Sequence, residues 1–211
     1  MSHDKRATER QTPEGGMRVR DRIFKTAREL FYRQGIRAVG VDDITSGAGT
    51  NKMSFYRSFA SKDELVTQCL RAQEGEYWAW WDEVIAPHAG DPRAQIEALF
   101  EASARKARDV ERCGCAISNA AVELRDDAHP GHAVIHEHKM EKRRRLRELA
   151  AAAGARDADA LGDALMLLLE GSAATRLTFS DCETAPLCNA LAGARALLDA
   201  QLAPPRAARR G

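Results

Sequence analysis

Long apolar runs are scarce in this chain. The longest uninterrupted one, residues 164–169, is far shorter than the roughly 20 residues that cross a bilayer as a helix. The first residues are polar and lack the apolar core of a secretion signal. We therefore expect a protein of the cytoplasm that does not enter a membrane.

Cysteine is sparse as well. The cysteines are odd in number and scattered, namely Cys69, Cys113, Cys115, Cys182 and Cys188. In a chain without an export signal, such a set argues against a disulfide framework, so we expect reduced thiols.

Familiar catalytic patterns are missing. The sequence contains no nucleophile elbow, no Walker loop, no glycine pattern of a dinucleotide-binding fold and no HExxH zinc motif. These absences exclude the enzyme classes that depend on such motifs, and we predict a protein that is not an enzyme and needs no cofactor. A small helical hydrolase is the alternative from another class.

Period-2 alternation of apolar and polar residues is also absent, which predicts an all-α fold. Apolar stripes at helical spacing, broken at glycine and proline, indicate about nine helices. Their approximate ranges are 18–34, 41–48, 52–59, 62–86, 92–108, 116–124, 131–153, 158–179 and 185–202.

The net charge is only +1, but the charges are unevenly distributed. Up to Lys62 there are thirteen Lys and Arg residues against seven Asp and Glu residues, so this front segment carries +6 and the remainder −5. A basic front and a mildly acidic body are typical of a nucleic-acid-binding head on a body that binds other partners. Chance asymmetry is the alternative, because +6 is modest.

The second and third predicted helices are short and joined by a turn that contains Gly49. This layout is typical of a helix-turn-helix, whose second helix enters the major groove of DNA with its N-terminal residues against the base edges. Those residues are Lys52, Met53 and Ser54. Lysine can donate to guanine, serine can bond to either type of edge, and methionine can contact a thymine methyl group.

Other residues of the same region are placed to hold DNA phosphates. The expected DNA-binding set is completed by Val41, Asn51, Tyr56, Arg57 and Lys62. Asn51 could instead only cap its helix, Tyr56 could belong partly to the core, and Lys62 could be a solvated charge. The basic residues Lys5, Arg6 and Arg10 could follow the minor groove, or their segment could be a disordered tail.

Together these residues resemble the N-terminal domain of the TetR family of repressors. The matching positions are Ala27, Leu30, Phe31, Gly35, Val41, Ile44, Ala48, Gly49, Phe55, Tyr56, Phe59 and residues 61–65. The pattern covers the first third of the chain, and the rest is similar to the family in helical character and length. The sequence departs from the usual pattern at Val39, Gly40, Thr50, Met53 and Ser58.

The resemblance implies a repressor that binds a palindromic double-stranded operator as a homodimer and is released by a small-molecule effector. Activation is the alternative, because sequence does not encode where an operator lies. We expect a disordered arm over 1–17, a helix-turn-helix domain over 18–62, a ligand-binding and dimerisation domain over 63–203 and a tail over 204–211.

By the same resemblance, the last two helices would pair across a two-fold axis, and the middle helices would enclose the effector. The expected pairing faces are Leu161, Leu165, Leu168 and Ser172, and Leu187, Leu191, Ala194, Leu198 and Leu202. The candidate pocket residues are Tyr77, Trp78, Trp81, Phe100, Ile117, Asn119 and Phe179. Burial in the core of one chain is the alternative for both sets.

Two further groups of residues could respond to a signal other than an organic effector. Cys113 and Cys115 could form a redox sensor, and His132 and His136 lie four residues apart on one helix face, as half of a zinc site would. Structural cysteines and a solvated helix face are the alternatives, and the basic run 142–145 is also interpreted as solvated. A redox- or metal-responsive regulator is therefore the alternative function.

Overall fold

The computed structural model describes residues 17–107, 114–176, 178–179 and 185–202. Every regular element in these ranges is helical, which confirms the predicted all-α fold. The nine α-helices of the described residues are α1 (Val19–Gln34), α2 (Val41–Gly47), α3 (Lys52–Ser58), α4 (Lys62–Ile85), α5 (Pro92–Ala107), α6 (Ala116–Glu123), α7 (Gly131–Ala152), α8 (Ala158–Thr175) and α9 (Ala190–Leu202). The predicted arm (apart from Met17) and tail, together with Cys113 and Cys182, lie outside the described ranges.

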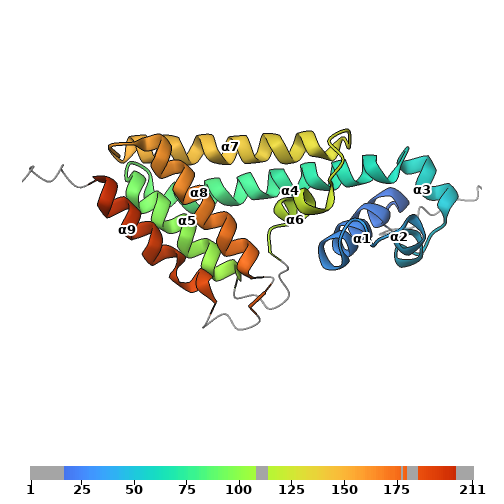
Figure 1. Cartoon of the computed structure of the whole chain (residues 1–211). Helices are drawn as coiled ribbons and strands as arrows, with labels where there is room; N and C mark the ends of the chain where they lie inside the picture. Colours follow the sequence, from blue (N-terminus) through green and yellow to red (C-terminus); the bar gives the residue numbers. More distant parts are fainter. Residues whose placement is uncertain (1–16, 108–113, 177, 180–184, 203–211) are drawn as a thin grey trace, which may run out of the picture.

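The molecule is elongated (Figure 1). Helices α1, α2 and α3 form a head at one end, and α5, α8 and α9 gather at the other. The long helices α4 and α7 run side by side between the two ends, and α6 lies below α4. None of the helices in the described ranges has both the length and the apolar character that a bilayer span requires.

Capping contacts fix where the short helices of the head begin. Asn51 Oδ1 accepts a hydrogen bond from the backbone N–H of Ser54 at 3.0 Å, and Ser61 caps α4 in the same way. Gly40 has no capping side chain, and its own N–H donates to Asp43 Oδ2 at 2.7 Å. The first turn of a helix leaves its N–H groups without partners, so these local contacts explain why the helix starts were predictable.

A first apolar core joins the head to the beginning of the body. Ile23, Ile44 and Phe55, one from each head helix, are fully buried in it. Leu65 of α4 and Ile117 of α6 belong to the same cluster. The domain boundary expected at residue 62 stays a prediction, and apolar packing continues across that point.

A second core fills the other end. It contains Trp81 of α4, Phe100 of α5, Leu146 of α7, Leu165 of α8 and Leu198 of α9. Helices α4 and α7 contribute side chains to both cores. Burial of a large apolar side chain stabilises the fold by roughly 1.5–3 kcal/mol, so each of these helices is held firmly at both ends.

The last two helices differ from their predicted bounds. Helix α8 ends at Thr175 rather than near Phe179, and α9 begins at Ala190 after a 3-10 turn, Pro186–Asn189. Ala185 is extended, with ψ of 140°, because a residue before proline is disfavoured in helical conformation. A second 3-10 turn, Ala86–His88, follows α4.

The side chains expected to pair between two protomers are largely used within one chain. Leu161, Leu165, Leu187, Ala194 and Leu198 are at most 2% exposed. The prediction was wrong for these residues, because their stripes pack onto the chain's own second core and the segment beside it. The large apolar side chain that α8 leaves open is Leu167, which is 73% exposed.

Candidate functional site

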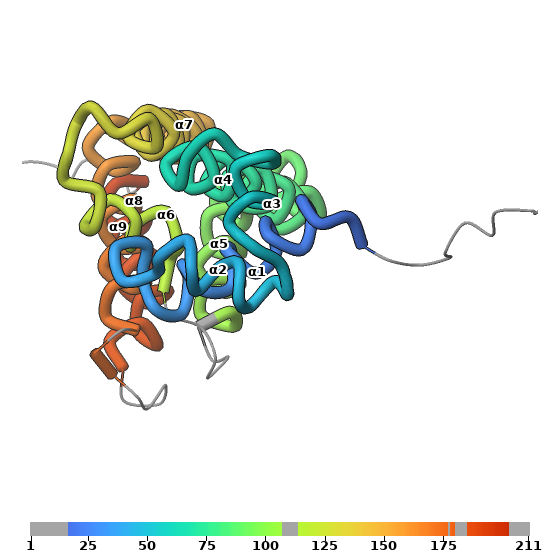
Figure 2. Tube along the Cα trace, turned by 90° about the vertical axis from the view of Figure 1, so that its right-hand side faces the viewer, coloured from blue at the N-terminus to red at the C-terminus, as the bar shows by residue number. Residues whose placement is uncertain are grey.

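Helix α3 lies in the head, and the end-on view in Figure 2 shows it beside α1 and α2 at the front of the molecule. Phe55 is completely buried, whereas Met53 and Tyr56 are 66% and 57% exposed. Lys52 and Arg57 are exposed as well. A short helix that displays large apolar and basic side chains to solvent is suited to contact with a partner.

Aromatic packing beneath α3 holds it in place. The ring centroids of Phe55 and Phe59 lie 5.9 Å apart, and Tyr56 meets Phe55 edge-on at 5.2 Å. The Arg20 guanidinium of α1 lies 4.8 Å from the Phe59 ring centroid, a favourable cation–π contact. The exposed side chains of α3 thus project from a helix that is packed firmly against its neighbours.

Lys52 connects the two helices of the helix-turn-helix. Its Nζ lies 2.8 Å from Asp42 Oδ1 at the start of α2, and both side chains are mainly exposed. The hydrogen bond from Lys52 to Asp42, reinforced by the carboxylate charge, raises the pKa of the lysine. Solvent weakens such surface pairs, so a nucleic acid can compete for this ammonium.

The other predicted DNA-binding residues vary in exposure. The side-chain oxygen of Asn51 caps α3 by accepting a hydrogen bond from the backbone N–H of Ser54. Ser54 itself is half-buried. Val41 is half-buried against the first core. Their roles toward DNA stay predictions.

Lys62 makes an internal contact that the sequence did not reveal. Its Nζ donates to the carbonyl of Ile36 at 2.6 Å and lies 5.9 Å from the Phe31 ring centroid. Burial lowers the pKa of Lys62. The ammonium therefore ties the start of α4 to the turn after α1, and its phosphate contact stays a prediction.

A cavity of about 490 Å³, partly open to solvent, is lined by α1, α4, α5, α6, α7, α8 and the segment leading into α9. Aromatic side chains from three of these helices line it, namely Tyr32, Tyr77, Trp80 and Phe100. The volume and the mainly apolar walls are typical of a site for a small organic molecule.

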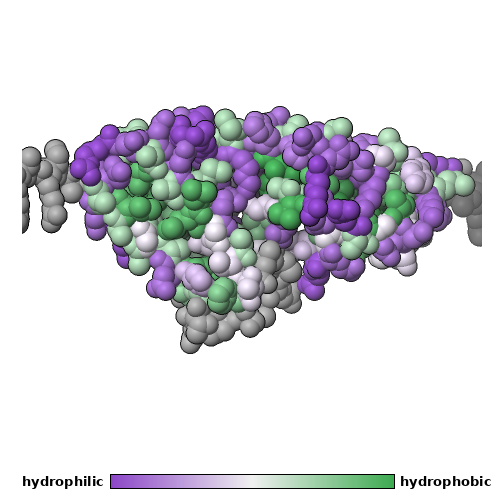
Figure 3. Space-filling view, in the orientation of Figure 1, coloured by the Kyte–Doolittle hydropathy of each residue, from purple (hydrophilic) through white to green (hydrophobic). Residues whose placement is uncertain are grey.

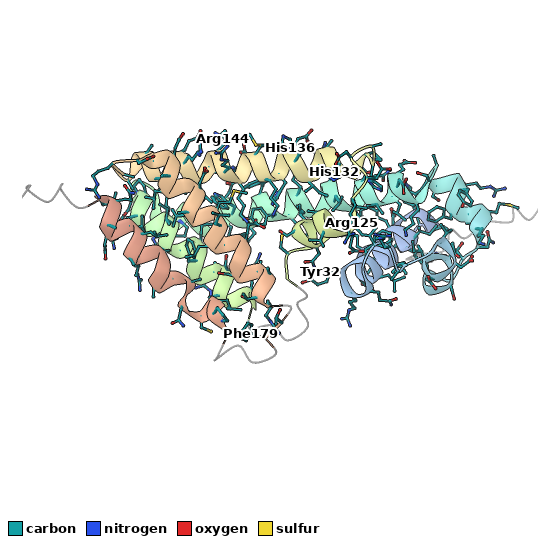
Figure 4. All side chains as sticks on the ribbon, viewed as in Figure 1. Tyr32, Arg125, His132, His136, Arg144 and Phe179 are labelled. Atoms are coloured by element: carbon teal, nitrogen blue, oxygen red, sulfur yellow. The ribbon has the colours of Figure 1, made fainter. Side chains whose placement is uncertain are left out.

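Some of the residues predicted for the pocket line this cavity and others do not. Tyr77, Phe100 and Ile117 do. Trp78, Trp81, Asn119 and Phe179 lie outside the lining. Trp81 turns into the second core at 1% exposure, and Figure 4 shows Phe179 beyond the end of α8.

Sequence reasoning missed Trp80 and Lys142. Trp80 lines the cavity, with Lys106 Nζ 3.9 Å from its ring centroid. Lys142 was assigned to a solvated helix face, which is wrong, because its side chain is only 6% exposed. The available signal was weak: Lys142 begins a run of basic residues in which Arg144 is exposed and Arg143 and Arg145 are half-buried.

Lys142 belongs to a partly buried charge cluster between α7 and α8. Its Nζ lies 2.7 Å from Glu170 Oε1, and Lys139 pairs with the other oxygen of the same carboxylate. Ser118 Oγ donates to Glu170 at 2.7 Å. Burial alone would raise the pKa of Glu170, but the two ammonium groups lower it to about 2. One carboxylate thus faces two cations.

His138 is fully buried next to this cluster. Its ring packs against Tyr77 and Trp78, with centroid distances of 4.7 and 5.0 Å, and neither ring nitrogen has a hydrogen-bond partner. Burial, reinforced by the charges of Lys142 and Lys139, lowers the pKa of His138 to about 3. The residue is therefore a neutral part of the core at physiological pH.

The metal-sensing alternative finds no support in the described residues, among which no three His, Cys, Asp or Glu side chains could hold a metal ion. Both His132 and His136 lie on α7 (Figure 4); His136 is exposed, whereas His132 is half-buried with its Nε2 2.9 Å from the Leu124 carbonyl oxygen. Cys115 is a half-buried free thiol at the cavity, and Cys113 lies outside the described residues.

Helix α6 connects the cavity to the head. It begins at the cavity wall with Ala116 and ends with Glu123, whose Oε2 accepts the backbone N–H of Arg37 at 2.9 Å. The Glu123 carboxylate also approaches Gly35 so closely that a Cβ there would lie 2.9 Å from it. Gly35 has φ of +90°, a conformation that favours glycine. A displacement of α6 would therefore reach the turn after α1.

Residues 23–69 match the family described as bacterial regulatory proteins, tetR family. The HTH-type transcriptional repressor KstR2 of Mycobacterium tuberculosis is 34% identical over 84 residues, which are 40% of this chain and 42% of that protein. The chain thus spans about two fifths of the length of this curated relative.

Solved structures match over more of the chain. A TetR-family transcriptional regulator from Streptomyces coelicolor is 29% identical with a TM-score of 0.82, and the match covers 88% of this chain and 96% of that one. A tetR-type transcriptional regulator from Streptomyces avermitilis is 30% identical with a TM-score of 0.75, and the match covers 88% and 98%.

Proposed function

Because this chain belongs to the TetR family of transcriptional regulators, we propose that it is a repressor that binds a palindromic operator as a homodimer and is released by a small molecule. The chain is accordingly a DNA-binding regulator and not an enzyme. The observation that carries the proposal is the rigid, N-capped helix α3 with its basic and apolar side chains displayed outward.

Within the operator complex, the N-terminal half of α3 would read the base edges. The Lys52 ammonium would leave Asp42 and donate a hydrogen bond to guanine, and Met53 would contact a thymine methyl group. Tyr56, Arg57 and the other basic groups of the head would contact phosphates, which set affinity and register rather than sequence preference.

The proposed dimer uses the open side of α8 and α9. Figure 3 shows apolar residues gathered over this end of the molecule. On α8 the exposed residues Ala160, Leu167, Gly171 and Ala174 follow helical spacing, and a Cβ on Gly171 would meet nothing within 4 Å. Small residues allow close approach of helices, so a second copy of this chain fits this face.

In the proposed release, an effector fills the cavity and favours a conformation that no longer fits successive turns of DNA. Two connections support this coupling. Helix α4 runs from the first core to the cavity wall, and α6 joins that wall to the turn after α1 through Glu123.

The test is genome-wide footprinting with the purified protein, followed by binding measurements on the recovered site. Lys52→Ala should cost about 1–3 kcal/mol on that site and relax the preference at one base position. Tyr56→Phe should weaken binding to every sequence alike, because it removes a hydroxyl and keeps the packing on Phe55. Uniform losses from both variants would contradict the assigned roles.

Arg144→Ala is the matched control. Arg144 is an exposed basic residue on α7, toward the end of the molecule opposite α3 (Figure 4). Its replacement removes one positive charge far from the proposed interface. Operator affinity should therefore stay at the parent value at moderate salt, where distant charges are screened.

A further inference from the structure

We propose that the ligand of this cavity is an organic acid, with an apolar ring-containing body and a single negative group that pairs with the Lys142 ammonium. The inference rests on the proposed function, since it names the chemical class of the ligand that this cavity takes.

The charges around Lys142 do not balance. Lys142 and Lys139 share one carboxylate, Glu170, so the cluster carries an excess of one positive charge. The Lys142 side chain is 6% exposed and lines the cavity. A buried charge is costly unless it is paired, and an anion entering the cavity would complete the pairing.

A cationic ligand lacks a comparable partner. Among the described residues that line the cavity, Glu76 is the carboxylate, and Arg28 holds both of its oxygens at 2.7 and 2.6 Å. Each oxygen of Glu170 already accepts an ammonium. A cation would have to displace one of these groups, whereas an anion would not.

The apolar walls of the cavity indicate the chemistry of the uncharged part of the ligand. Trp80 and Phe100 present aromatic surface, and Leu169 adds aliphatic surface. Tyr77 lies next to the anchor, with Lys142 Nζ 5.2 Å from its ring centroid. Flat apolar rings stack well on such surfaces, while one charged group fixes their orientation.

The test uses a matched pair of fluorescent probes on the DNA-free, full-length protein. Both are N-phenyl-1-naphthylamines: 8-anilinonaphthalene-1-sulfonate carries one anionic sulfonate, and the parent amine carries none. Lys142→Met should weaken the sulfonate at least about tenfold, as expected for loss of a charge-assisted hydrogen bond, and should leave the uncharged amine within about twofold.

Two further variants sharpen the result. Arg144→Met removes a charge from the outer side of the same helix, so both probes should bind as they do to the parent. Glu170→Gln removes the competing carboxylate, so the sulfonate should bind more tightly; a thermal melt confirms that the variant is folded. Equal weakening of both probes by Lys142→Met, or weaker sulfonate binding to folded Glu170→Gln, overturns the proposal.

A separate measurement distinguishes this inference from the proposed function. The sulfonate probe is added to the labelled operator complex, and release is followed by fluorescence anisotropy. Lys142-dependent binding without release would uphold the acidic-ligand inference and refute effector-driven release by such acids. Release that is equally strong with Lys142→Met would refute the anchor and leave the repressor function intact.

Discussion

Buried polar side chains decide much of the chemistry of this protein at the residue scale. His138 is enclosed by Tyr77 and Trp78, and the ammonium groups of Lys142 and Lys139 lie close by. Neither the burial of His138 nor that of Lys142 was predictable from the local sequence. The rings that cover His138 come from α4, and the carboxylate that pairs with Lys142 comes from Glu170. Both partners are distant along the chain.

Acid should destabilise the protein through His138. Its folded pKa of about 3 lies below the ordinary 6.5, so between these values the unfolded chain binds a proton that the folded chain does not. Stability should therefore fall as the pH drops through this window, by roughly 2–3 kcal/mol between pH 7 and pH 4.5. Urea unfolding at the two pH values measures the change.

The matched variants are His138→Phe and His136→Phe. The first removes the buried imidazole and should abolish most of this pH dependence. The second replaces an exposed histidine of the same helix and should retain the parent's behaviour. If His138→Phe shows the same loss of stability in acid as the parent, the buried imidazole is not its source.

At the scale of the element, the sequence predicts where helices begin but not which surfaces they pack against. The starts of α3 and α4 followed from Asn51 and Ser61, because a cap is a contact within three residues. The apolar stripe of α8 was also visible, but a stripe does not say which surface covers it. Leu161 and Leu165 turned out to face the chain's own core.

The contact between α7 and α8 should not tolerate a larger side chain at Gly162. A Cβ at this position would lie 2.8 Å from Arg147 N and Cα, which belong to the backbone and cannot rotate away. Gly162→Ala should therefore destabilise the protein by about 1–3 kcal/mol in chemical unfolding, the usual cost of overpacking.

Gly75 supplies the control for this substitution. It lies in α4, is exposed, and a Cβ there would meet nothing within 4 Å. Gly75→Ala should stabilise the protein by about 0.5–1 kcal/mol, because alanine loses less backbone entropy in a helix. A stabilising Gly162→Ala would show that α7 and α8 are packed less closely than described.

At the scale of the whole molecule, the proposed assembly depends on the open side of α8 and α9. Leu167→Arg places a charge on that face and should convert the proposed dimer to monomer at micromolar concentration, with loss of operator binding. Sedimentation velocity measures the assembly state. A charge that is buried without a partner is strongly unfavourable, so the effect should exceed tenfold in the dimer dissociation constant, about 1.4 kcal/mol.

Met140→Arg is the comparison for the assembly test. Met140 is an exposed apolar residue at 48%, but it lies on α7, outside the proposed dimer face. Its replacement introduces the same side chain without affecting α8 or α9. A monomeric Met140→Arg variant, or a dimeric Leu167→Arg variant, would place the interface elsewhere.

Helix α4 is continuous from Lys62 to Ile85, and its first turns belong to one core while its last turns belong to the other. One residue of an α-helix corresponds to a rotation of about 100° and a rise of about 1.5 Å. An insertion in the middle of α4 would therefore turn α3 about the axis of α4 relative to the α8–α9 face. The number of residues in α4 thus sets the angle about its axis between α3 and the α8–α9 face. A loop of variable length in place of α4 could not keep that angle constant.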